Sequence, residues 1–249
     1  MPFHVLGWEL SASNAALTDL VPIVDGIAQV SGNTFFVPKG MDYIVCATAL
    51  INSPTATLRA QIITPSLRAV FPVDISPINN GLVFGSLPRI VPYFFNPLPI
   101  VDQEPLEVQT QNGAAVMNRI FLTIADAALK PTTGKIYTVR FTTSITLVTA
   151  TWANGALTFG TTLPAGNYQV VGARVWSANG VYARFFFKGS FFRPGVPMIN
   201  AEDNNEWSWH RMGNVGVFDQ FNNVTPPSLD AMGVTDTAQQ GYLDLIKVS

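Results

Sequence analysis

Short runs of alternating apolar and polar positions recur along the chain and predict β-strands. Three clear examples are KIYTVRFTTSITLVTATW, YQVVGARVW and RIFLTIAD, which are rich in the β-branched and aromatic residues that favour a pleated, half-buried surface. Turn sequences such as SGN, INNG, ANG and FRPG interrupt such runs about every 8 to 12 residues. The 18 prolines and 19 glycines also argue against long helices. We therefore expect an all-β protein.

The strands expected in the first half are short and closely spaced. They are His4–Leu10, Gln29–Val37, Tyr43–Ile51, Thr57–Ile63, Ala69–Val73, Leu82–Phe84, Arg89–Phe94, Leu106–Thr110 and Arg119–Ala125. About eight such strands in about 125 residues fit a jelly roll, a sandwich or barrel of two sheets with Greek-key connections. An immunoglobulin-like sandwich is the rival, but its Cys…Trp…Cys spacing is missing from the sequence. Short helical turns are expected over Ser13–Leu20 and Ser228–Met232.

The two halves of the chain resemble one another. Phe36–Ile62 and Thr162–Phe187 each contain a Pro-x-Gly, then an aromatic residue, a strand pattern, a turn and a second strand pattern with an arginine. Further matches follow in order at a separation of about half the chain. The pairs are Gly40 with Gly166, Arg59 with Arg184, Asn79–Asn80 with Asn204–Asn205, Phe95–Asn96 with Phe221–Asn222, Asp102 with Asp230, and Asn112–Gly113 with Gln240–Gly241. A repeat this long is a domain, so we expect two tandem jelly-roll domains, residues 1–130 and 131–249, that meet near Ala128–Lys135.

The charge content narrows the range of partners. Only 12% of the residues are charged, the net charge is −2, and lysine and arginine form no cluster. A protein that contacts phosphates needs a basic stripe, so we expect no direct binding of nucleic acid. The long uncharged stretch between Arg140 and Arg174 alternates and contains Pro164, so it predicts strands and no transmembrane helix. The N-terminus does not fit a secretory signal peptide.

One segment, Ile199–Met212 (INAEDNNEWSWHRM), concentrates groups with chemical potential. It carries the residues Glu202, Asp203, Glu206, Trp207, Trp209 and His210. These could form a sugar site with two stacking tryptophans, or a calcium loop. The matching segment around Asn79–Asn80 has no such charges, which favours a structural loop followed by a strand. Whether the Glu202–His210 segment binds a ligand stays open at this point.

Catalytic patterns are missing from the sequence. The two histidines, His4 and His210, are expected one in each half, whereas metal catalysis of the β-barrel type needs several close together. There is no G-x-S-x-G, and Glu104 and Glu107 are interpreted as solvated loop and edge-strand residues. Cys46 lies in an apolar strand pattern and predicts a buried, unreactive thiol. We expect no enzyme, and no catalytic, cofactor-binding or metal-binding residue.

Phenylalanine is concentrated in Ala183–Gly195 (ARFFFKGSFFRPG) and, more weakly, in Val91–Val101. Neighbouring side chains of a strand point to opposite faces, so Phe186 lies opposite Phe185 and Phe187. Strands that are apolar on both faces, in a chain with few charges, indicate permanent interfaces. We expect an obligate homotrimer, with Phe186 or Phe192 at a contact between subunits.

These features together resemble the double jelly-roll major capsid proteins of tailless icosahedral viruses. The likeness covers the whole chain and rests on two equal β-rich halves, few charges and few histidines. It implies homotrimeric, pseudo-hexagonal capsomers in the virion shell, in contact with neighbouring capsomers, with minor capsid proteins and with an underlying viral membrane. A lectin-like or phage receptor-binding β-sandwich is the main alternative, and a secreted double-barrel hydrolase is a third class.

Overall fold

The computed structural model describes residues 3–51, 57–67, 71–73, 89–199 and 209–248. Its strands fall into two compact units. One unit comprises Val5–Ala128, and the other comprises Leu129–Ser249 together with the first residues of the chain, of which Phe3 and His4 are described. The chain therefore passes from one unit to the other twice, after His4 and after Ala128.

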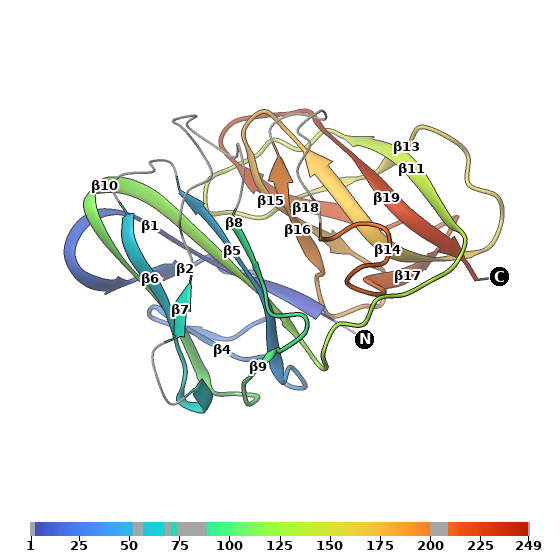
Figure 1. Ribbon diagram of the computed structural model, residues 1–249. Coiled ribbons are helices and arrows are strands. Elements are labelled where there is room, and N and C mark those ends of the chain that lie inside the picture. Colours follow the sequence, from blue (N-terminus) through green and yellow to red (C-terminus); the bar gives the residue numbers. More distant parts are fainter. Residues whose placement is uncertain (1–2, 52–56, 68–70, 74–88, 200–208, 249) are drawn as a thin grey trace. The chain divides into compact units, whose positions relative to one another are not determined.

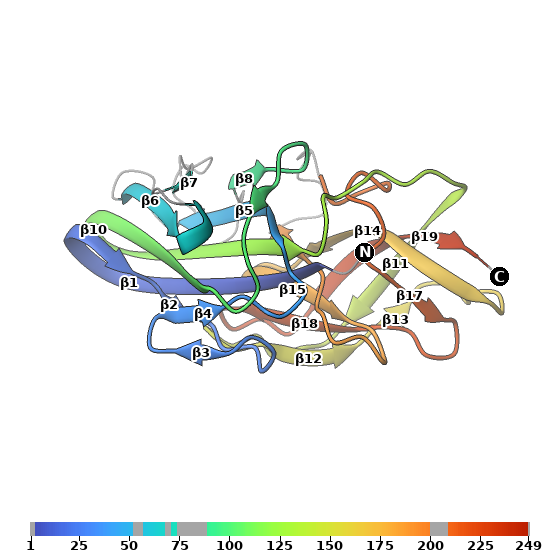
Figure 2. The ribbon, with the colours of Figure 1, turned by 90° about the horizontal axis from the view of Figure 1, so that it is seen from below.

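The unit Val5–Ala128 is built from strands and one short 3₁₀ turn, coloured blue to green in Figure 1. Its strands are β1 (Phe3–Asp19), β2 (Val21–Pro22), β3 (Val30–Ser31), β4 (Thr34–Phe36), β5 (Tyr43–Ile51), β6 (Thr57–Ile63), β7 (Phe71–Val73), β8 (Arg89–Pro92), β9 (Leu98–Pro99) and β10 (Pro105–Ala125), and the 3₁₀ turn is η1 (Pro65–Leu67). β3 and β4 form a short antiparallel hairpin (Figure 2).

The long strand β10 organises this unit, because each of its halves pairs with different strands. Its C-terminal half, Asn118–Ala125, pairs with β5, which also pairs with β8 and β9. Its N-terminal half, Glu107–Asn112, pairs with β6, and β6 pairs with β7. β1 and β4 also pair with β10. The pairings give two rows, β1–β10–β5–β8 and β4–β10–β6–β7.

The unit that contains Leu129–Ser249 is also built from strands, and its residues from Leu129 onward are coloured yellow-green to red in Figure 1. Its strands are β11 (Ile136–Thr143), β12 (Ala153–Ala156), β13 (Thr158–Phe159), β14 (Asn167–Trp176), β15 (Gly180–Phe186), β16 (Gly195–Ile199), β17 (Asp219–Asn222), β18 (Ser228–Gly233) and β19 (Gln239–Lys247). One row is β11–β19–β14–β17 and the other is β12–β18–β15–β16. β16 also pairs in parallel with the end of β14, which joins the rows.

The Pro-x-Gly turns occupy matching places in the two units. Gly40 has φ of 80° and comes shortly before β5, while Gly166 has φ of 146° and comes directly before β14. β5 and β14 each pair with the last strand of their own unit. Such φ values are open to glycine and strained for other residues, so both turns depend on this residue type.

Several sequence predictions can be compared with these strands. Tyr43–Ile51 and Thr57–Ile63 are confirmed as β5 and β6. Leu106–Thr110 and Arg119–Ala125, expected as two strands, are both parts of β10. β10 continues between them, with a register shift between Gln111 and Asn112. Leu82–Phe84 lies outside the described residues.

The two predicted helical turns are wrong. Ser13–Leu20 continues β1 as far as Asp19, and Ser228–Met232 lies in β18. β18 pairs with β12 on one side and β15 on the other, and it buries Leu229, Ala231 and Met232. Pairing and burial of this kind outweigh a weak local preference for helix. Among the described residues no helix is long and apolar enough to cross a membrane.

The cores of the units are aromatic and aliphatic. Trp8 and Phe35 meet edge to face at 4.9 Å in one unit, and Phe3 and Phe218 do so at the same distance in the other. Phe185 is fully buried. Contacts of this kind combine apolar burial with the edge-to-face geometry that aromatic rings prefer.

The phenylalanine alternation predicted for Ala183–Gly195 is present in β15 and the residues after it. Phe185 and Phe187 are buried, and Phe186 is only partly buried. The guanidinium of Arg193 lies over the Phe186 ring at 4.1 Å from the centroid. The outer face of this strand is therefore partly covered by the same unit, which leaves Phe191, 61% exposed, as the open ring of the segment.

Cys46 lies in β5 with no exposed surface, and its thiol donates weakly to the carbonyl of Ala47. Burial raises the pKa of the Cys46 thiol to about 12, against a small lowering by its hydrogen bond with Thr48. The thiolate is the reactive form, so we expect native protein to resist a thiol reagent at pH 8 for as long as it stays folded. Labelling followed by mass spectrometry checks this, with urea-unfolded protein as the control. Rapid labelling of the folded protein would contradict it.

Candidate functional site

The segment singled out in the sequence is described only at its end. Glu202, Asp203, Glu206 and Trp207 lie outside the described residues, so their arrangement adds nothing to the site. Trp209 and His210 are described, and His210 is 3% exposed. Its backbone carbonyl accepts a hydrogen bond from Ala173 of β14. The end of the segment therefore bonds to β14, but residues 209–212 form a turn, so the strand predicted to continue to Met212 is wrong over these residues.

The carboxylates Glu104 and Glu107 hold loops in place. Glu104 accepts hydrogen bonds from the backbone and hydroxyl of Ser66, at 3.0 and 2.8 Å, and from the backbone of Val101. Glu107 accepts one from the Thr34 hydroxyl at 2.5 Å. Both side chains are half-buried, so they are less solvated than the sequence suggested. Their oxygens are used in structural contacts.

The two histidines do not divide between the units as expected. His4 comes early in the sequence but belongs by its contacts to the unit of Leu129–Ser249. Its ring is buried, and its Nδ1 accepts a hydrogen bond from the backbone of Arg193 at 3.1 Å. Among the described residues no three His, Cys, Asp or Glu side chains gather in a way that could hold a metal ion.

Asp244 of β19 is a buried charge whose two carboxylate oxygens are both hydrogen-bonded. It has no exposed surface, and each carboxylate oxygen accepts two hydrogen bonds. Oδ2 accepts from Arg211 Nε at 2.6 Å and the Met212 backbone at 2.8 Å, and Oδ1 accepts from Arg211 Nη2 at 2.9 Å and Thr138 Oγ1 at 2.7 Å. Burial raises the pKa of this carboxyl, but these hydrogen bonds outweigh burial and the pKa is lowered. Asp244 therefore ties β11, β19 and the 209–213 loop together.

A glycine in β14 makes room for this carboxylate. A Cβ built on Gly172 would lie 2.5 Å from Asp244 Oδ2 and 2.9 Å from the backbone of Arg211. The register of β14 with β19 shifts between Val170 and Gly172. The bulge and the missing side chain together let the 209–213 loop approach the sheet.

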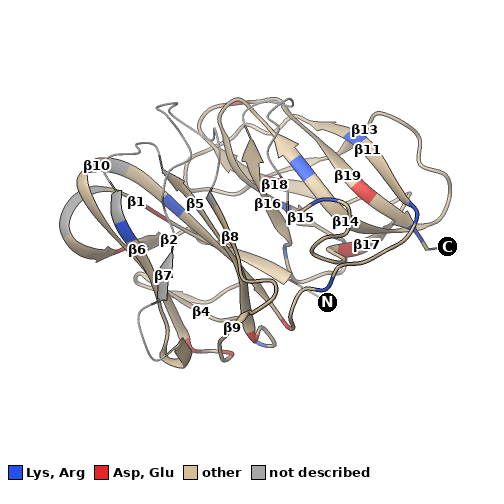
Figure 3. Cartoon of the chain, viewed as in Figure 1, with Lys and Arg blue, Asp and Glu red and all other residues tan. Residues whose placement is uncertain are grey.

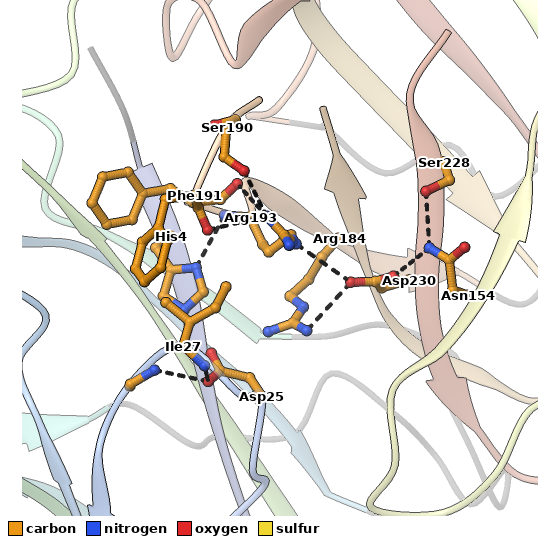
Figure 4. A network of polar contacts seen from close by, with 12 residues as sticks. His4, Asp25, Ile27, Asn154, Arg184, Ser190, Phe191, Arg193, Ser228 and Asp230 are labelled. Carbon is orange, nitrogen blue, oxygen red and sulfur yellow. Dashed lines mark hydrogen bonds and ion pairs between the residues drawn. The ribbon is translucent and has the colours of Figure 1, made fainter. Parts of the chain in front are cut away.

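A second polar network surrounds Asp230 of β18 and is drawn in Figure 4. Asp230 accepts from Arg184 at 3.4 Å and from Asn154 at 2.6 Å, and Arg193 lies 3.8 Å away. The Arg184 guanidinium also lies over the Trp152 ring at 3.8 Å. Arg184 is 2% exposed, so this network fixes a buried cation between strands.

Arg193 connects that network to the loop that presents Phe191. Its Nη1 donates to the carbonyls of Ser190, Phe191 and Phe192 at 3.0 to 3.3 Å (Figure 4). The loop is thus held from inside by one side chain. A rigid loop loses little conformational freedom on binding, which makes an exposed ring such as Phe191 a good anchor for a partner.

The exposed apolar side chains form the remaining candidate surface. Phe95 is 88% exposed in the unit Val5–Ala128, and Phe191 and Val224 are 61% and 76% exposed in the other unit. Charges are sparse and scattered over the described ribbon (Figure 3). Large exposed aromatics on a weakly charged surface are typical of contacts between proteins.

Acid should destabilise the protein through His210. Burial lowers the pKa of His210 to about 4 from an ordinary value of 6.5. Between pH 6.5 and 4 the unfolded chain therefore takes up a proton that the folded chain refuses, so stability falls as pH falls through this window. The difference in pKa corresponds to about 3 kcal/mol lost by pH 4.

The test compares wild-type protein with His210→Gln by urea unfolding at pH 7 and pH 4. Asp244 also contributes to acid sensitivity, since its lowered pKa gives stability that is lost at still lower pH. The variant should nevertheless lose less stability than wild type across this window. An equal loss in both proteins would show that His210 does not cause it.

Comparison with protein-family models, with curated proteins and with solved structures finds no match to this chain.

Proposed function

We propose that this chain is a double jelly-roll major capsid protein, a structural subunit that assembles into homotrimeric capsomers of an icosahedral shell. The single observation that carries the proposal is the strand pairing shared by the two all-β units. Six jelly rolls in a trimer give a pseudo-hexagonal outline from cyclic symmetry, which is a shape that tiles a closed shell.

The strand pairings within each unit support a jelly-roll interpretation. In one row the first strand lies beside the last, and the last lies beside the strand that follows the Pro-x-Gly turn, as in β1–β10–β5 and β11–β19–β14. In the other row of the first unit, the N-terminal half of β10 pairs with β6, the strand after β5. In the other row of the second unit, β18, the strand before the last, pairs with β15, the strand after β14. These pairings are compatible with the Greek-key sandwich that the sequence predicts, and they support the proposal on that basis.

The surfaces of the units favour a role in assembly over a role in catalysis. In the described part of the chain the carboxylates Glu104, Glu107 and Asp244 are held in structural hydrogen bonds. The exposed Phe95 and Phe191 offer apolar anchors. Permanent interfaces bury well over about 2,000 Å², and a surface with few charges loses little solvation energy when it is covered.

Electron microscopy of purified protein at micromolar concentration tests the proposal. The expected particles are three-fold capsomers with six lobes, and closed shells at higher concentration. Discrete small oligomers that never form a shell would contradict it and favour the receptor-binding alternative.

A further inference from the structure

A half-open pocket of about 460 Å³ lies at one end of the unit of Leu129–Ser249. Strands β14 and β17 form part of its wall, with Asn167 and Asn222 paired in register. The turn after β17 contributes Thr225, the turn after β15 contributes Lys188, and the chain after β19 contributes Val248. Figure 1 shows β14, β17 and the end of β19 at this end of the unit.

Hydrogen bonds fix the floor of this pocket before any ligand binds. Asn222 Nδ2 donates to Asn167 Oδ1 at 3.0 Å, and Asn222 Oδ1 accepts from the backbone of Val224 at 3.2 Å. The backbone of Val248 donates to the carbonyl of Asn167 at 2.9 Å. A wall held in this way needs little reorganisation to bind a ligand.

Three side chains around the floor keep hydrogen-bonding capacity. Within the described residues, the side-chain amide of Gln220 and the hydroxyl of Thr225 make no hydrogen bond, and the Lys188 ammonium makes no ion pair. All three are exposed. Among the described residues that line the pocket none is a carboxylate, and Lys188 gives this described lining one positive charge. Such a lining favours an anion over a cation.

The aromatic residue of the pocket does not offer a stacking surface. Phe221 is 6% exposed, and its ring is stacked with Tyr168 at 5.7 Å and with Phe159 at 6.3 Å. Recognition here must therefore depend on hydrogen bonds and charge. A matching ligand carries one carboxylate for Lys188, and hydroxyls that donate to and accept from Gln220 and Thr225.

We propose that this pocket binds a hydroxylated carboxylate, the chemistry of an acidic sugar. The pocket volume lies within the range of small-molecule sites. The inference does not rest on the proposed capsid function, because every group involved belongs to one unit. The same chemistry occurs in free sugar acids and at the ends of acidic glycans.

Saturation-transfer NMR with glucuronate, glucose and acetate tests the site on the whole protein. Glucuronate should bind at least about tenfold more tightly than glucose or acetate, since a hydrogen bond to a charged group and the hydroxyl contacts each add affinity. Lys188→Gln should remove that advantage over glucose. Lys135→Gln, which changes an exposed lysine outside the pocket, should leave binding unchanged.

Equal binding of glucuronate and glucose, equal binding of acetate and glucuronate, or full binding by Lys188→Gln would each overturn the proposal. A glucuronate-terminated oligosaccharide that binds more tightly than free glucuronate would assign the ligand to a glycan. Equal binding of the two would assign it to the free acid. These results are independent of whether the protein forms a shell.

Discussion

Replacement of Asp244 by Asn should destabilise the unit of Leu129–Ser249 by about 3 kcal/mol. Four donors from Arg211, Met212 and Thr138 point at the two carboxylate oxygens, and the carboxylate is fully buried. An asparagine would turn an amide NH₂ toward two of those donors and would leave the Arg211 charge without its counterion. Unsatisfied buried donors carry the full cost of desolvation. Thermal unfolding should shift down by roughly 10 °C or more.

Asp219→Asn is the matched control in the same unit. Its carboxylate is only partly buried and accepts a hydrogen bond from the neighbouring backbone of Gln220 at 2.7 Å. Its replacement should change stability by less than about 1 kcal/mol. If both variants unfold at the same temperature as wild type, Asp244 is not the central tie of this unit.

Replacement of Phe191 by Asp should abolish assembly while each unit stays folded. The Phe191 ring is 61% exposed and packs only edge-on against Phe192 at 5.6 Å, so its loss leaves no hole in the core. At an interface, an aspartate would be desolvated without a partner, at a cost of several kcal/mol per contact. A loss of this size in binding free energy raises the dissociation constant far above the micromolar range, so the variant should not assemble at micromolar concentration. Phe191 is a better test position than Phe186, which Arg193 partly covers.

Phe191→Tyr separates the loss of the ring from the addition of a charge. It keeps the aromatic surface, so it should assemble nearly as wild type does. Far-ultraviolet circular dichroism checks that both variants stay folded. A Phe191→Asp variant that assembles normally would place this loop outside the interface and would move the test to Phe95, which is 88% exposed.

The sequence predicted the strand content well where local pattern and pairing agree. β5 and β6 have the predicted bounds. In the sequence, a Pro-x-Gly precedes the apolar run of β5, and INSP, which is typical of a turn, separates that run from the segment of β6. Leu106–Thr110 and Arg119–Ala125 were predicted as separate strands, whereas pairing with β6 and then with β5 makes both of them parts of β10. The helical turn expected at Ser228–Met232 failed for the same reason.

The polar sites were harder to predict, because their members come from distant parts of the chain. Asp244 is the one acidic residue of the apolar strand sequence GYLDLIKV, a pattern that indicates a buried charge. The neighbouring sequence does not indicate that Thr138 and Arg211 are its partners. His4 and Phe3 pack in a unit whose remaining residues begin at Leu129. The pocket around Lys188 and Gln220 is likewise assembled from four separate segments, so only the fold brings them together.

Sedimentation of the wild-type protein across micromolar concentrations tests the central claim most directly. We predict a species of three times the 27.0 kDa chain mass, in equilibrium with larger shells as concentration rises. A stable monomer of 27.0 kDa over the whole range, with no larger species, would contradict the capsid proposal.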